Sequence, residues 1–259
     1  MSDGTGGGDG APKLSGLVVA RNEEARIADC LASLAFCDEI VVVLDRCTDR
    51  TREIAEAAGA RIVAGEWPLE GDRRNAGIAA CEGDWILELD ADERPTPALA
   101  AEIRAAIANA PPGFFNIPFD HYIGTTLVRH GWGGYWGVRT RRVLFARGCK
   151  SWGAGRVHPA TRVSGVEGHL QNPIAHYVDR DISDMLRRLD SYTTAHARDL
   201  RESGDIGTFG HNVRRIFSRF FKCYVSRKGY REGPYGFLIA LMAGLYPILS
   251  YLKARLETD

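Results

Sequence analysis

Short apolar runs alternate with helix-like segments between residues 14 and 109, and this alternation limits the fold more than any other feature of the chain. We interpret the apolar runs as strands at 14–20, 39–44, 61–64 and 85–90. The helical patterns cover 24–36, 48–59, 72–81 and 97–109, with Thr48 and Thr96 as the expected N-caps of the second and fourth. This β-α-β-α-β-α-β order predicts an α/β fold, with a mostly parallel sheet, right-handed crossovers and flanking helices.

The last of these strands runs into two carboxylates, Asp90 and Asp92, before the chain breaks at Pro95. Side chains at positions i and i+2 of a strand project on the same side, so this pair can converge on one ligand. Mg²⁺ takes carboxylate oxygens and often keeps substrate phosphates as further ligands. An isolated Asp-x-Asp pair is more typical of an acidic turn, but its neighbours in this chain favour a metal–diphosphate site.

Polar side chains also follow the first two strands. Arg21, Asn22 and Glu23 come after the first, and Asp45 comes after the second. Open parallel sheets bind ligands outside the carboxyl ends of their strands. Three polar clusters at three strand ends therefore predict one ligand site at that edge of the sheet.

The net charge of zero conceals an asymmetry between the two halves of the chain. Residues 1–110 hold 11 Lys/Arg and 21 Asp/Glu, whereas residues 111–259 hold 22 and 12. The basic second half indicates an anionic partner, such as a membrane surface, a nucleic acid or a phosphorylated substrate. The six cysteines have no metal-binding spacing and no secretory signal precedes the first strand, so we expect free thiols in a reducing cytoplasm.

After the Pro-Pro-Gly sequence at 111–113, we expect strands at 114–119, 122–128 and 142–146 and a helix at 181–203. The C-terminal residues are both basic and apolar. Residues 211–231 contain seven Lys/Arg and no acidic residue. An apolar stripe lies opposite basic residues there, formed by Val213, Ile216, Phe217, Phe220 and Tyr224 facing away from Arg215, Arg219 and Lys222.

A basic amphipathic helix suits an anionic lipid surface, although a core-facing helix with a solvated basic back has the same pattern. The uncharged segment 236–252 that follows has seventeen residues, which is short for a membrane span. We favour a helix embedded in the membrane interface over a helix buried in the protein, and both over a full transmembrane pass.

Four ordered segments, 18–24 (VVARNEE), 45–51 (DRCTDRT), 73–77 (RRNAG) and 89–93 (LDADE), together resemble glycosyltransferase family 2. The resemblance implies a GT-A fold with a Rossmann-like sheet and an inverting sugar transfer. Weaker similarity in later segments extends towards the bacterial lipopolysaccharide-core β-1,4-glucosyltransferase group, whose members share a basic, apolar C-terminal tail. These segments are 131–145, 152–158, 176–192 and 236–240.

The resemblance implies roles for the residues at the strand ends. Asp90 and Asp92 would hold Mg²⁺ or Mn²⁺ against the diphosphate of a UDP-sugar, where the metal stabilises the charge of the departing nucleotide. Asn22 and Glu23 would line the nucleotide pocket. Arg21 would contact a phosphate, because its planar fork suits phosphate oxygens.

Three further residues match the family pattern around the nucleotide. Asp45 would contact the uridine, and Arg74 with Asn75 would support the base or ribose. The chain departs from the pattern at Leu44, where many members carry a second acidic residue. It also lacks the usual acid at 137–138 and at Pro159.

These departures leave the catalytic base open. Inversion requires a base within hydrogen-bond reach of the acceptor hydroxyl, opposite the leaving nucleotide. The candidates are Glu93, Asp120 and His158, and we favour Asp120, near the end of a strand beyond the metal site. Aromatic residues in the same region would either stack on sugar faces or pack a core; they are Trp132, Tyr135, Trp136 and Trp152.

The combined prediction is an inverting enzyme that moves a hexose, with glucose expected, from a UDP-sugar to a lipid-anchored glycan such as lipopolysaccharide core. It would work on the cytoplasmic face of the inner membrane, without a nucleic-acid partner. Residues 1–12 would be a disordered tail, 13–110 the nucleotide-sugar half, 111–180 the acceptor half and 181–259 a helical, membrane-associating extension.

Two alternatives remain. One is a non-catalytic, membrane-associated protein that binds nucleotides or glycans. The other is a nucleotidyltransferase, but those enzymes usually carry a Gly-rich phosphate loop after the first strand, and residues 20–24 contain no glycine.

Overall fold

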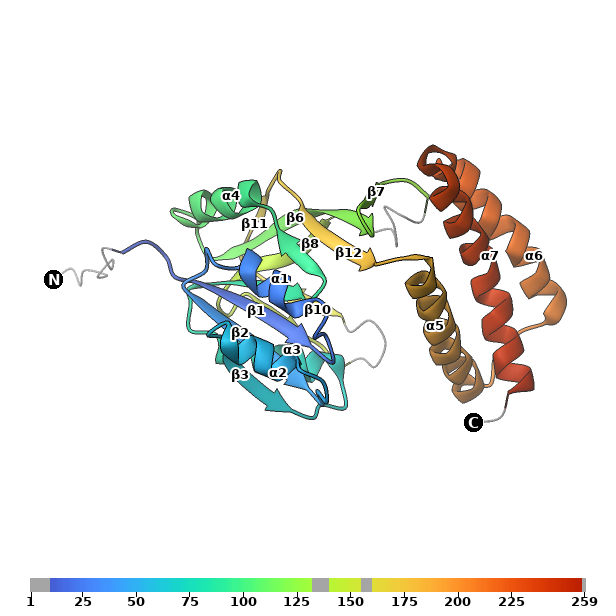
Figure 1. The fold of residues 1–259 in the computed structure, drawn as a ribbon, viewed down its shortest axis with the longest axis horizontal. Helices are drawn as coiled ribbons and strands as arrows, with labels where there is room; N and C mark the ends of the chain where they lie inside the picture. The colour runs from blue at the N-terminus through green and yellow to red at the C-terminus, as the bar shows by residue number, and fades with distance from the viewer. Residues whose placement is uncertain (1–9, 132–139, 155–159, 258–259) are drawn as a thin grey trace. The chain divides into compact units, whose positions relative to one another are not determined.

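The computed structural model describes residues 10–131, 140–154 and 160–257, and the chain folds into two compact units (Figure 1). Unit 1 comprises Met1–Pro118 and Thr140–Ala175, and unit 2 comprises Phe119–Arg139 and His176–Asp259. Residues 1–9, most of the expected disordered tail, lie outside the described residues, as do Trp132, Tyr135, Trp136 and His158.

Unit 1 contains the predicted parallel sheet. β1 (Leu14–Ala20) pairs in parallel with β2 (Glu39–Asp45) on one side and β4 (Trp85–Asp90) on the other, and β3 (Arg61–Gly65) extends the sheet beyond β2. β8 (Thr140–Ala146) pairs antiparallel with β4, and the first part of β6 (Gly113–Ile123) pairs antiparallel with β8, so the order is β3-β2-β1-β4-β8-β6. This mostly parallel, mixed sheet with flanking helices confirms the predicted fold class.

Both faces of β1 are buried, which explains its nearly continuous apolar sequence. Leu17 and Val19 of β1 form a core with Val41 and Val43 of β2, and Ile78 of the third helix packs against it. Because β1, β2 and β4 run in the same direction, their carboxyl ends meet at one edge of the sheet, where the predicted site lies.

Four helices connect or follow these strands: α1 (Ile27–Ser33), α2 (Thr51–Ala57), α3 (Glu70–Ala80) and α4 (Pro97–Ile107). α4 begins as predicted, because the Thr96 hydroxyl accepts a hydrogen bond from the Leu99 N–H at 3.1 Å. The N-cap predicted at Thr48 is wrong: α2 begins three residues later. Thr48 instead donates its N–H to the Asn22 side chain in the loop after β1, at 2.8 Å.

Five further strands have three or four residues each: β5 (Glu93–Pro95), β7 (Thr126–Val128), β9 (Lys150–Trp152), β10 (Thr161–Val163) and β11 (Val166–His169). The continuous strand predicted at 122–128 is wrong. β6 (Gly113–Ile123) ends before Gly124, whose φ of 57° turns the chain, and β7 returns antiparallel with Val128 opposite His121. A two-residue hairpin turn favours a residue that tolerates positive φ, which is glycine here.

Unit 2 is built mainly from three helices: α5 (Ile182–Ser203), α6 (Phe209–Phe221) and α7 (Gly233–Leu256). The last strand, β12 (Ile174–Asp179), leads into α5. α5 matches the predicted helix, and the Asp181 carboxylate caps it by accepting from the Asp184 N–H at 2.8 Å. Short helical turns at Lys222–Ser226 and Gly229–Glu232 connect α6 to α7, and α7 packs against both α5 and α6.

The apolar stripe predicted on α6 is divided between buried and exposed positions. Phe220 and Tyr224 pack against Phe237 of α7, with ring centroids 5.6 and 6.0 Å apart. Phe217 is 71% exposed. Arg219, predicted on the opposite, solvated face, donates to the Ala243 carbonyl of α7 at 3.1 Å. The face of α6 that contacts α7 therefore includes Arg219, while Phe217 points into solvent.

One helical stretch in the described residues, Gly229–Leu256, is long and apolar enough by length and composition to cross a membrane. In the structure, 44% of its most apolar window is buried. Buried Ile239 and Ala240 belong to the core of unit 2, whereas Phe237 and Leu241 are exposed. The helix thus contributes to the protein core on one side and presents apolar side chains on the other.

Candidate functional site

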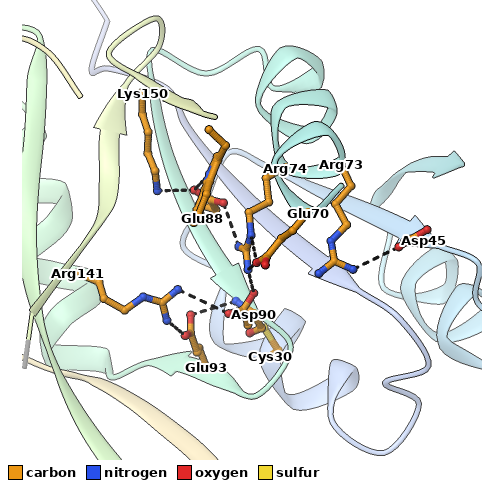
Figure 2. A network of polar contacts seen from close by, with 11 residues as sticks. Cys30, Asp45, Glu70, Arg73, Arg74, Glu88, Asp90, Glu93, Arg141 and Lys150 are labelled. Atoms are coloured by element: carbon orange, nitrogen blue, oxygen red, sulfur yellow. Dashed lines mark hydrogen bonds and ion pairs between the residues drawn. The ribbon is translucent and has the colours of Figure 1, made fainter. Parts of the chain in front are cut away.

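The carboxyl end of β4 carries a network of hydrogen bonds and ion pairs (Figure 2). Glu88 and Asp90 alternate with buried Leu87 and Leu89, so strand geometry sends the two carboxylates to the same face. Glu88 is only 1% exposed, whereas Asp90 is half-buried at the end of the strand. A buried carboxylate requires compensating charges, and two cations supply them.

Arg74 of α3 is the first of these cations. It donates to Glu88 at 3.0 Å and to Asp90 at 2.8 Å, and its Nε donates to Glu70 at 2.9 Å. Burial alone would lower the pKa of Arg74, but the surrounding carboxylates outweigh burial and raise the pKa. The resemblance implied that Arg74 supports the base or ribose; the structure places it on the carboxylates of β4.

Lys150 of β9 is the second cation. Its ammonium donates to Glu88 at 2.6 Å and to the Arg142 carbonyl at 2.9 Å. Burial alone would raise the pKa of Glu88, but Lys150 and Arg74 outweigh burial and lower the pKa. Glu88 therefore stays ionised inside the fold.

Glu93 and Arg141 hold the other side of the strand end. The Glu93 side chain is completely buried; it accepts a hydrogen bond from the Asp90 N–H at 3.0 Å and forms an ion pair with Arg141. Arg141 also lies 3.6 Å from Asp90 Oδ2. Asp90 is thus flanked by one arginine from α3 and another from β8.

Asp92 and Glu23 add negative charge to the same edge. Asp92 forms an ion pair with Arg26 at 3.6 Å. Burial raises the pKa of Glu23, Arg26 opposes this, and the charges of Asp92 and Asp90 add to the increase. These carboxylates therefore lie close enough to repel one another. Carboxylate oxygens are the ligands that a hard divalent cation takes, so the side-chain chemistry of Asp90 and Asp92 suits the predicted metal.

The loops after β1 and β2 are bonded to each other. Asn22 adopts a φ of 56°, and its side-chain Oδ1 accepts a hydrogen bond from the N–H of Thr48. The Glu23 N–H donates to the Thr51 hydroxyl at 2.8 Å. Arg21 is exposed beside them. The predicted nucleotide-binding residues of the first loop are therefore fixed against the second loop.

Asp45 is 2% exposed and surrounded by donors. Arg46 binds both of its oxygens at 2.9 Å, and Arg73 lies 3.4 Å from Oδ2. Burial opposes ionisation, but the hydrogen bonds from Arg46 and Trp67 outweigh it and lower the pKa of Asp45. Arg73, which sequence analysis did not select, is the arginine of α3 that reaches Asp45.

Asn75 exchanges two hydrogen bonds with the backbone of Trp152, each at 2.9 Å, and so ties α3 to β9. The Trp152 ring lies 4.8 Å from the Arg74 guanidinium carbon and 4.9 Å from the Lys150 nitrogen. Both residues therefore support the network around Glu88.

The structure brings together most of the predicted strand-end residues in unit 1. Asp120 belongs to unit 2, where it accepts a hydrogen bond from Arg129 at 3.1 Å. Three further residues of this network, Glu88, Arg141 and Lys150, were not predicted from the sequence. Glu88 had a detectable signal, since it lies two residues before Asp90 and interrupts an apolar strand; the two cations had none.

Comparison with known proteins agrees with this geometry. A family model described as glycosyl transferase family 2 matches residues 15–150, about half of the chain. An uncharacterized glycosyltransferase of Rickettsia bellii is 36% identical over 98 residues, which cover 38% of this chain and 33% of that protein. The aligned region thus spans about a third of the length of the Rickettsia relatives.

A second relative aligns over nearly the whole chain. The lipopolysaccharide core biosynthesis glycosyltransferase LpsC of Rhizobium meliloti is 25% identical over 254 residues, 93% of this chain and 91% of that protein.

Similar solved structures include S. aureus TarS, with a TM-score of 0.40 and 26% identity over 46% of this chain and 24% of that one. Another is Mycobacterium tuberculosis glucosyl-3-phosphoglycerate synthase with Mn²⁺ and UDP, with a TM-score of 0.36 and 24% identity over 43% and 44%. The family match covers the strand-end residues of β1, β2 and β4, and on that match the chain belongs to glycosyl transferase family 2.

Proposed function

We propose that this protein transfers a hexose from a UDP-sugar to a glycan acceptor, with the donor bound at the carboxyl edge of the unit 1 sheet. The proposal rests on one observation: polar residues at the carboxyl ends of β1, β2 and β4 gather at the same edge of the sheet. Asp90 lies there between Arg74 and Arg141. Family membership and the LpsC relative support sugar transfer as the chemistry. We propose glucose as the hexose and inversion as the stereochemical outcome.

Asp90 and Asp92 would hold Mg²⁺ or Mn²⁺. When bound, such an ion neutralises the diphosphate of the donor and of the leaving UDP. The chain's own residues position these ligands: Arg74 fixes one oxygen of Asp90, and Arg26 lies beside Asp92. Asn22 is held in the loop after β1 by its bond to the second loop, next to the proposed phosphate contact Arg21.

Asp45 remains our proposed uridine contact. Arg46 already binds both of its oxygens, so uridine binding requires Asp45 to exchange at least one bond with Arg46 for one with the base. Arg46 is partly exposed and its backbone has a φ of 52°, so it lies in the turn that follows β2. Asp45→Asn should therefore lower the affinity for UDP strongly and lower the free energy of unfolding only slightly.

Asp120 is our proposed catalytic base. It is partly exposed and its ion pair with Arg129 lies near the surface. Glu93 is a weaker candidate because its side chain is fully buried and paired with Arg141. Asp120→Asn should abolish sugar transfer while leaving UDP binding unchanged, whereas a loss of both would assign Asp120 to donor binding.

Calorimetric titration with UDP, with and without Mn²⁺, tests the donor site directly. Wild-type protein should bind UDP in a metal-dependent manner, and Asp92→Asn should lose the metal-dependent part. The matched control is Asp84→Asn. Asp84 directly precedes β4, at the end of the strand opposite Asp90, and its carboxylate accepts a hydrogen bond from the Lys13 N–H. Metal-independent UDP binding in the wild type, or an equal loss in both variants, would contradict the proposed site.

We further propose that the acceptor is a lipid-linked glycan such as lipopolysaccharide core, and that unit 2 lies on the anionic cytoplasmic surface of the inner membrane. Two exposed aromatic rings on α6, Phe217 and Phe221, and exposed Phe237 on α7 support this proposal. Basic residues accompany them, including exposed Arg214 and Lys222. Apolar side chains flanked by cations are typical of proteins that bind anionic membranes.

A further inference from the structure

The guanidinium group of Arg74 is the junction of the network at the end of β4 (Figure 2). Its nitrogen atoms bind three carboxylates: Nε donates to Glu70, Nη1 to Glu88 and Nη2 to Asp90, and Nη2 also lies 2.9 Å from Glu70 Oε1. A planar guanidinium holds its donors in fixed directions. The positions of Glu70 and Glu88 therefore determine where Arg74 holds Oδ1 of Asp90.

Glu88 is held more firmly than Glu70. The Glu70 side chain is 35% exposed, whereas Glu88 is buried and its Oε2 accepts from the Lys150 ammonium at 2.6 Å and the Trp152 indole at 3.3 Å. A buried side chain with several charged partners has less freedom than an exposed one. Glu88 is thus the fixed point from which the orientation of Arg74 is set.

We propose that Glu88 is a positioning residue: fixed by Lys150 and Trp152, it orients Arg74 so that the Asp90 carboxylate is preformed for a divalent cation. This inference rests on the proposed metal-dependent function. It assigns Glu88 a role through Arg74, without contact with the cation or the donor. Hydrogen-bond partners of metal ligands typically contribute about 10–100-fold to metal affinity or activity.

Mn²⁺ binding to the full-length protein, followed by electron paramagnetic resonance of the free ion, tests the proposal without turnover. Glu88→Gln keeps the size of the side chain and removes its charge, so Mn²⁺ binding should weaken by about 10–100-fold. Glu39→Gln is the matched control. It removes a partly buried carboxylate that pairs with Arg61 at the opposite edge of the same sheet, and it should leave Mn²⁺ binding unchanged.

Arg74→Lys keeps the positive charge but loses the geometry that reaches three carboxylates, so it should weaken Mn²⁺ binding to a similar extent. The two substitutions are then combined in one protein, Glu88→Gln with Arg74→Lys. If Glu88 acts through Arg74, this double variant should bind Mn²⁺ no more weakly than whichever single variant has the lower Mn²⁺ affinity, because the effects of coupled residues are not additive. Effects that multiply in the double variant would overturn the proposed route.

In Glu88→Gln, the Lys150 ammonium is buried beside a neutral amide. A buried charge without a counter-charge destabilises the folded state. Glu88→Gln combined with Lys150→Met removes one negative and one positive charge and leaves the net charge of the network unchanged, so this pair should fold and show the same loss of Mn²⁺ affinity. Wild-type affinity in either form, or an equal loss in Glu39→Gln, would overturn the positioning role. Failure of the wild-type protein to bind Mn²⁺ would instead overturn the proposed metal site, and this inference with it.

Discussion

Glu39, the first residue of β2, connects the amino ends of several elements through one carboxylate. It accepts hydrogen bonds from the Ser15 hydroxyl of β1, from Arg61 of β3 at 2.8 Å and from the Gly83 N–H before β4 at 3.0 Å. Burial alone would raise its pKa, but these bonds outweigh burial and lower the pKa from 4.5 to about 2. The ionised form of Glu39 therefore stabilises the folded state.

We expect Glu39→Gln to lower the free energy of unfolding by about 1–2 kcal/mol at neutral pH, after allowance for solvent screening of a partly exposed carboxylate. A depressed folded-state pKa stabilises the protein above the unfolded pKa of 4.5, and this contribution is lost as the pH falls towards 2. Urea unfolding of both proteins should give a difference that is largest at neutral pH and shrinks below pH 5. A difference that grew on acidification would contradict the assignment.

Individual site residues were predictable where the signal was local. Asp90 and Asp45 follow apolar strands directly, so their place at the sheet edge follows from strand length. Their partners were not predictable: Lys150 is 62 residues from Glu88 in sequence, and only the folded sheet brings the two together. Arg74 matched a family motif, but its carboxylate partners depend on the register of α3 against β4.

Among the elements, α6 and α7 approach each other closely at Gly244. A Cβ added there would lie 2.7 Å from the Ile216 carbonyl oxygen of α6, which is too close for a backbone contact. We expect Gly244→Ala to lower the free energy of unfolding by about 1–3 kcal/mol, because the two helices must separate. Thermal or urea unfolding measures this change.

Gly210, near the start of α6, supplies the control for that substitution. A Cβ added at Gly210 meets no atom within 4 Å, so Gly210→Ala should change stability by less than about 1 kcal/mol, in the stabilising direction, through helix propensity alone. Equal destabilisation by the two substitutions would show that the helix contact at Gly244 is not the cause.

Elements with a strong local signal matched prediction, and those set by tertiary contacts did not. β1 and β4 have the predicted bounds because each is built mostly from apolar residues and is buried along nearly its whole length, and α4 begins at the predicted cap. Thr48 failed as a cap because its N–H and hydroxyl bond instead to Asn22 across the neighbouring loop. No local pattern reports that competition.

At the scale of the whole molecule, the proposed membrane contact can be tested through the exposed aromatic residues of α6. Phe217 and Phe221 are 71% and 61% exposed. Replacing both with Ser should reduce binding to vesicles that contain anionic lipid, since each buried apolar side chain contributes about 1.5–3 kcal/mol. Vesicle co-sedimentation measures the change, and binding should also fall as the salt concentration rises.

The control for this surface is a pair on α5 with similar chemistry, Ile182 and Leu186, which are 50% and 51% exposed. Replacing both of these with Ser should leave vesicle binding unchanged. If the α5 pair reduced binding as much as the α6 pair, general apolar exposure rather than the α6 surface would explain the interaction.

The charge asymmetry predicted a chain with two different halves, but the chain's route between the units was not predictable from composition. Unit 2 takes in 119–139 from the middle of the sequence as well as everything after 175. Contacts within unit 2 join these pieces: His121 bonds to His176 at 3.0 Å, and the Gly124 N–H donates to the Asp179 carbonyl at 2.7 Å. These contacts depend on how β6 and β12 lie in the folded protein, which composition does not reveal.

This interleaved route has a consequence for how such a gene can change. A single genetic crossover exchanges everything on one side of one position, and here the chain passes from one unit to the other inside β6, after β7 and again inside β12. No single crossover can therefore give unit 1 a complete foreign unit 2, because 119–139 would stay behind with its old partner. Replacing unit 2 as a whole would take an exchange at each of the three places where the chain passes between the units.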